Sequence, residues 1–278
     1  MKTLGIENSY WGWGASFLDV DNDGDLDLAS VNGFDSPGIT EDDGYFIDRP
    51  PQLWINDGNS GTKMKDLWNA YGFNTRKEGR ALLSWDYDSD GDLDMLVINN
   101  KERTELFRND GGNSQNYIRV KAIEDITEGG GRSSIGAIVY IKLNRDDDKE
   151  IVSYIGSKEQ YLSHGEVTAH FGLGSRTSPV HHVRVVWLPR ITNMTLDSTV
   201  SSSYFSNTTL RNTVIVRDVP IRSTLRVQRP LGSNVTEVYK ASWLGQCGKM
   251  AIVSVKQPVF GAVALQPGSR WLKYNPPR

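Results

Sequence analysis

The 278-residue sequence predicts a mainly β protein, and three of its features support this prediction. An acidic loop of nine residues occurs twice, at 19–27 and 86–94, each time as Asp-x-Asp-x-Asp-Gly-Asp-Leu-Asp. A second motif, Leu-x-x-Asn-Asp-Gly, also occurs twice, at 53–58 and 106–111. After the second loop, apolar residues stand at alternate positions, which is the period of a half-buried strand. We therefore expect short strands joined by repeated turns.

The spacing of the acidic residues in each loop predicts a calcium site. Five carboxylates in nine residues repel one another unless a hard cation lies among them. Calcium binds roughly six to eight oxygen ligands, and a loop that supplies them from positions 1, 3 and 5 must curl around the ion. Glycine at position 6 permits the sharp turn, position 7 offers its backbone carbonyl, and position 9 closes the coordination sphere.

Two such loops predict about two calcium ions. The candidate metal ligands are Asp19, Asp21, Asp23, Asp25, Asp27, Asp86, Asp88, Asp90, Asp92 and Asp94. The alternative interpretation is a pair of acidic surface turns that bind nothing, since aspartate is common in turns. The exact repetition of the spacing favours the metal sites over this alternative.

The loops begin like an EF-hand but do not end like one. An EF-hand requires Glu at position 12, where this chain has Ser30 and Val97. It also requires a helix on each side, whereas the flanking segments here are short and apolar. Leu93, Met95 and Val97 stand at alternate positions, as in a strand. We therefore predict that each acidic loop connects two strands.

The two motifs recur in the same order, so residues 1–115 contain two related units. Each unit reads as strand, acidic loop, strand, connection, strand and Asn-Asp-Gly turn, and that turn is a hairpin signal. The first unit is longer, which indicates an insertion at about 36–51. Repeats of short strands suggest propeller blades, and a closed propeller needs about four or more. We expect a partial β-propeller of about two blades.

Residues 12–28 resemble the FG-GAP/VCBS repeat of integrin-type β-propellers. In that family the aspartates of the loop bind calcium. The resemblance therefore implies calcium ligands at positions 1, 3, 5 and 9 of both loops, and every one of these positions is aspartate in this chain.

The segment after the repeats resembles a second family, the ASPIC/UnbV domain. This domain follows VCBS repeats in proteins similar to cartilage acidic protein. The resemblance implies a β-rich domain at about 116–218. The segments that carry it are 116–121, 134–141, 161–163, 170–174 and 183–187.

The net charge of −3 hides a strong asymmetry along the chain. Residues 1–110 carry 22 acidic and 10 basic side chains, whereas 219–278 carry one acidic and nine basic ones. The acidic half argues against nucleic acid as a partner. No run of apolar residues is long enough to span a membrane. We assign no fold to the basic tail at 219–278.

The expected location rests on the family resemblance, which implies an extracellular protein. The N-terminus has no apolar signal segment. Our hypothesis is that this chain is a fragment that lacks its signal peptide and further N-terminal blades. Three sequons, at Asn193, Asn207 and Asn234, would then allow glycosylation. Cys247 is the single cysteine, so the chain has no internal disulfide.

The sequence favours a calcium-binding, non-enzymatic, extracellular module for recognition or adhesion, with an unknown protein or glycan as its ligand. It contains no nucleophile elbow, phosphate loop or zinc motif. The alternative is an enzyme, or an accessory domain of one, that acts on carbohydrate or a secreted metabolite. Converging His and Asp/Glu residues outside the acidic loops would favour the alternative, and aromatic-rich blade faces would favour recognition.

Overall fold

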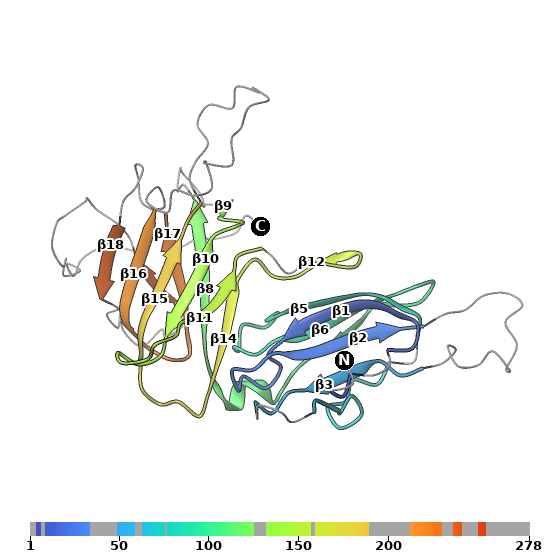
Figure 1. The fold of residues 1–278 in the computed structure, drawn as a ribbon. Helices are drawn as coiled ribbons and strands as arrows, with labels where there is room; N and C mark the ends of the chain where they lie inside the picture. The colour runs from blue at the N-terminus through green and yellow to red at the C-terminus, as the bar shows by residue number, and fades with distance from the viewer. Residues whose placement is uncertain are drawn as a thin grey trace, which may run out of the picture.

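A computed structural model shows a mainly β protein, as the sequence predicts (Figure 1). Within the described residues, the regular structure apart from strands is a single 3-10 turn, η2 (Gly112–Ser114). No helix in that part of the chain has the length and apolar character needed to cross a membrane. The structure describes residues 4–6, 9–33, 49–58, 63–75, 77–124, 132–156, 159–188, 212–229, 236–240 and 250–253.

The two sequence repeats form two small antiparallel sheets. The first has the strand order β1-β2-β3-β4 and the second the order β5-β6-β7. Each acidic loop connects the first two strands of its sheet, so the strand–loop–strand prediction is confirmed. The strands are β1 (Gly12–Leu18), β2 (Asp27–Asn32), β3 (Gln52–Ile55), β4 (Lys65–Asp66), β5 (Gly79–Trp85), β6 (Asp94–Asn99) and β7 (Glu105–Phe107).

The two sheets of the repeats share one apolar core. Leu93, Met95 and Val97 are all buried in it, as their alternation predicts. The first strands of the two sheets lie close together, because β1 carries a glycine where β5 approaches. A Cβ on Gly14 would lie 2.7 Å from the backbone nitrogen of Leu82. The sheets are arranged like two neighbouring blades and close no barrel within the described residues, which agrees with a partial propeller (Figure 1).

The second domain consists of two sheets with a common core. One has the order β11-β10-β15-β16-β18 and the other the order β14-β8-β17-β19. Both sheets contribute to a single apolar cluster, which includes Val183 of β15 and Ile118 of β8. The strands are β8 (Asn116–Glu124), β10 (Ile138–Lys142), β11 (Ile151–Tyr154), β14 (Ala169–Gly174), β15 (Val180–Val186), β16 (Thr213–Val219), β17 (Ser223–Gln228), β18 (Thr236–Lys240) and β19 (Met250–Val253).

Two smaller elements extend from the second domain. Strand β9 (Arg132–Ser133) pairs with β8, and β12 (Glu159–Gln160) pairs with β13 (Ser163–His164). The β12–β13 hairpin reaches the repeats, where the Ser163 hydroxyl donates to the Leu82 carbonyl at 2.7 Å. The repeats and the second domain therefore contact each other at this hairpin, in addition to being joined by the chain (Figure 1).

Part of the basic tail, for which the sequence suggested no fold, belongs to the sheets of the second domain. Strand β17 lies between β8 and β19 and runs parallel to both, and β18 runs parallel to β16. Other sequence features lie outside the described residues. These are most of the predicted insertion at 36–51, the asparagines of the three sequons and Cys247.

Candidate metal centres

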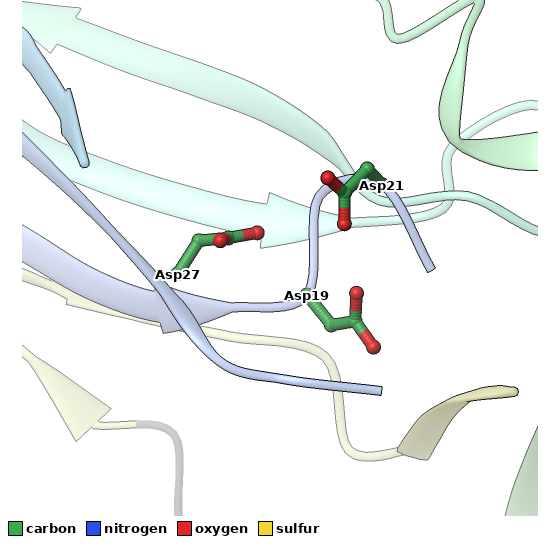
Figure 2. Close-up of side chains that lie close together, drawn as sticks. All are labelled: Asp19, Asp21 and Asp27. Atoms are coloured by element: carbon green, nitrogen blue, oxygen red, sulfur yellow. The ribbon is translucent and has the colours of Figure 1, made fainter. Parts of the chain in front are cut away.

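The structure brings three of the five aspartates in each loop together, at positions 1, 3 and 9. One carboxylate oxygen from each lies within 4.8 Å of the other two. Figure 2 shows the first cluster, at the point where the chain leaves β1 and enters β2. The two clusters are Asp19, Asp21 and Asp27 in the first loop, and Asp86, Asp88 and Asp94 in the second.

The aspartate at position 1 shapes each loop by accepting two backbone N–H groups. Its Oδ1 accepts from position 5, at 3.1 Å in both loops. Its Oδ2 accepts from the glycine at position 6, at 3.0 Å in the first loop and 3.1 Å in the second. The left-handed backbone that this turn needs is also repeated. The φ angles at positions 4 and 6 are 59° and 102° in the first loop, and 64° and 101° in the second.

The aspartate at position 9 is held by both repeated motifs. In the first loop, Asp27 Oδ2 accepts the N–H of Val20 at 2.9 Å, and Oδ1 accepts the N–H of Asn56 at 2.8 Å. In the second loop, Asp94 accepts the same two bonds, at 3.0 Å and 2.8 Å. Asn56 and its counterpart Asn109 begin the Asn-Asp-Gly motifs. These motifs were predicted only as hairpin turns, and the structure shows that they also position the last candidate ligand.

The carboxylates at positions 5 and 7 lie outside the two clusters. In the first loop, Asp23 Oδ1 accepts the N–H of Asp25 at 2.8 Å. In the second, Asp90 and Asp92 both accept hydrogen bonds from Asn113, at 2.6 Å and 2.9 Å. N–H groups thus bond one oxygen each of Asp23, Asp90 and Asp92, whereas Asp92 Oδ1 is buried with no hydrogen-bond partner among the described residues. Their role as direct metal ligands stays a prediction.

Burial makes the clusters electrostatically costly when all their carboxylates are ionised. Burial, with a smaller contribution from the neighbouring carboxylates, raises the pKa of Asp19 and Asp27 to about 7, although hydrogen bonds from backbone N–H groups oppose this shift. In the second loop, burial raises the pKa of Asp94, and the pKa of Asp92 reaches about 7. Burial also raises the pKa of Asp86, although the Arg119 guanidinium opposes this shift.

The first cluster also contains an oxygen that the protein leaves unsatisfied. Asp21 Oδ1 is buried and has no hydrogen-bond partner among the described residues. Asp21 lines a cavity of about 420 Å³, together with aromatic residues such as Tyr71 and Phe73. Clustered carboxylate oxygens, one of them without a partner, form a donor set that fits a hard divalent cation. Water in the cavity could complete its coordination.

Comparison with known families identifies part of the chain. Residues 127–204 match the family described as ASPIC and UnbV. The chain therefore contains an ASPIC/UnbV domain, as the sequence predicted. No curated protein matches the chain. The matched segment includes all the strands from β9 to β15.

Several residues around the clusters were not predicted from the sequence. Arg119, His170 and Gly172 come from the second domain and contact the acidic loops. These residues are distant from the loops in sequence, so no local pattern indicates them. By contrast, the sequence does point to the asparagines at 56 and 109, because the Leu-x-x-Asn-Asp-Gly motif that contains them follows each acidic loop.

The raised pKa values predict how pH and calcium together affect stability. Because these carboxyls have a higher pKa in the folded chain than in the unfolded one, their contribution to the metal-free stability falls as pH rises from about 4 to about 7. Calcium binds the ionised form, so it should raise the melting temperature more at about pH 8 than at about pH 5. Calorimetric scans with calcium and with EGTA measure this difference. An equal calcium effect at both pH values would contradict the prediction.

Proposed function

We propose that this chain is a calcium-binding, non-enzymatic module for extracellular recognition or adhesion. In this proposal, two calcium ions stiffen two FG-GAP/VCBS-type repeats. The observation that carries the proposal is the convergence of the same three positions in both loops. The unsatisfied oxygen of Asp21 supports it independently.

The chemistry of the clusters favours calcium over other common ions. Every clustered side chain is a carboxylate, and hard oxygen donors suit calcium or magnesium better than zinc, which prefers nitrogen and sulfur. Magnesium demands near-ideal octahedral geometry and retains several waters, whereas calcium tolerates the irregular geometry of a protein loop. Calcium at these positions would be structural, because each cluster connects the end of one strand to the start of the next.

The extracellular setting and the recognition role rest on supporting observations. Extracellular modules often bind calcium with Kd values of roughly 10⁻⁴–10⁻³ M, which suits a calcium-rich compartment. Exposed aromatic side chains supply large contact area at interfaces, and the repeats expose several of them. These are Trp11, Phe17, Tyr71 and Tyr87. We propose that exposed aromatic side chains of the repeats contact a protein or a glycan ligand.

Calorimetric titration of the full chain tests the metal sites. We expect about two calcium ions per chain, one for each cluster. Asp21→Asn and Asp88→Asn should each remove about one site, because the amide keeps the shape of the side chain and removes its charge. Asp146→Asn is the matched control, since this exposed residue lies outside both loops. Full stoichiometry in both loop variants would refute the ligand assignment.

An array of glycans and extracellular-matrix proteins tests the recognition role. The labelled chain should bind at least one component in calcium at about 1 mM and lose this binding in EGTA. The double variant Phe17→Ser/Tyr87→Ser should weaken it about tenfold, because buried aromatic contacts dominate interface energies. Tyr154→Ser, an exposed aromatic of the second domain, is the control. Unchanged binding by the double variant, or no binding to any component, would contradict this role.

A further inference from the structure

The two acidic loops lie against two neighbouring strands of the second domain, the first loop against β14 and the second against β8. Arg119 of β8 and His170 of β14 face each other in the register of these strands. Arg119 Nη1 donates to Asp86 Oδ2 of the second loop at 2.5 Å. His170 Nε2 and Asn22 Oδ1 of the first loop are 2.6 Å apart. Each member of one cross-strand pair thus contacts a different loop.

Arg119 connects a carboxylate of the second cluster to the second domain. Its side chain is 5% exposed, and that of Asp86 is 1% exposed. Its other terminal nitrogen donates to Glu166, which follows the β12–β13 hairpin. A buried guanidinium between two carboxylates is stabilising only while all its partners remain in place. Arg119, a residue outside the repeats, therefore holds Asp86, the position-1 aspartate of the second loop.

Asn22, at position 4 of the first loop, connects three parts of the molecule. It is fully buried, and its Nδ2 donates to the carbonyls of Gly91 and Gly112 at 3.1 Å and 3.0 Å. Its Oδ1 is therefore the acceptor, and His170 Nε2 must carry the proton of their hydrogen bond. The Asn22 carbonyl accepts the N–H of Gly174 at 2.8 Å. The first loop is thus bound to the second loop, to η2 and to β14.

Two glycines allow the loops and the strands to meet at backbone distance. A Cβ on Gly172 of β14 would lie 2.0 Å from Asp19 Oδ2 and 2.6 Å from the carbonyl carbon of Asn22. A Cβ on Gly91 of the second loop would lie 1.9 Å from the ring of Tyr117 in β8. A side chain at either position would overlap the facing atoms, so the packing of β8 and β14 against the loops depends on the loop conformation.

We propose that the two acidic loops, held in shape by their cations, form a cation-dependent joint between the repeats and the second domain. The inference rests on the proposed calcium binding and adds a role for Arg119 and His170 as positioning residues. Loss of the cations leaves the clustered carboxylates to repel one another, and the loops then lose the shape that β8 and β14 contact. By linkage, docking of the second domain strengthens calcium binding.

The contact at the β12–β13 hairpin does not depend on the cations. There, Ser163 bonds the backbone of Leu82, and the rings of Trp13 and Tyr161 are 5.5 Å apart between centroids. None of these groups is a carboxylate of the loops. Chelation should therefore loosen the arrangement of the two parts around this hairpin without separating them.

Small-angle X-ray scattering and calcium titration of the full chain test the joint. In the wild type, EGTA should increase the radius of gyration. His170→Ala should show the increase even in calcium and should bind calcium at least about fivefold more weakly, with two sites retained. Gly172→Ala should also increase the radius of gyration in calcium and weaken calcium binding, because the added methyl group collides with Asp19. His181→Ala is the control, since this histidine lies on β15 in the other sheet.

The outcomes separate the joint from the proposed function. Absence of calcium binding to the wild type would defeat both. Two bound ions with the same scattering in calcium and in EGTA would overturn the joint alone. The joint would equally be refuted if His170→Ala and Gly172→Ala both matched the wild type in scattering and in affinity. The wild-type comparison needs no substitution, so it remains decisive if a variant fails to fold.

Discussion

The structure depends on how the charge of two aspartate clusters is balanced. In each loop, three carboxylates have oxygens within 4.8 Å of one another, and the position-1 and position-9 aspartates are buried. Backbone N–H groups satisfy some of their oxygens but carry only partial charge. A divalent cation is the simplest source of the missing positive charge, because it binds several carboxylates at once. The turns between the strands are stable to the extent that this balance holds.

The two loops are nearly identical in sequence but differ in their surroundings. The second loop receives a guanidinium from Arg119 and two hydrogen bonds from Asn113. The first loop instead lies against the backbone of β14, and its Asn22 joins both loops. One motif therefore serves two purposes. It forms the turn within each sheet, and it contacts the ASPIC/UnbV-containing domain.

The parts of the molecule that depend on local sequence could be predicted, and those that depend on distant contacts could not. The spacing of Asp19, Asp21 and Asp27 alone indicates a curled loop, and alternating apolar residues indicate the strands that flank it. The pairing of β17 with β8 joins residues roughly a hundred positions apart in parallel, and no periodicity reveals it. The same holds for Arg119, whose partner Asp86 lies 33 residues away. Asp23 and Asp90 illustrate a subtler limit. Their spacing suggests metal ligands, but in the structure both accept hydrogen bonds from N–H groups and lie outside the two clusters, so their role as ligands stays a prediction.

Anomalous diffraction from crystals grown in calcium at about 1 mM tests the central claim most directly. The charge-balance account predicts two anomalous peaks, each at about 2.3–2.6 Å from oxygens of one cluster. One peak should lie among Asp19, Asp21 and Asp27, and the other among their counterparts in the second loop. A well-ordered map without peaks at these positions, with the aspartates turned into solvent, would contradict the account.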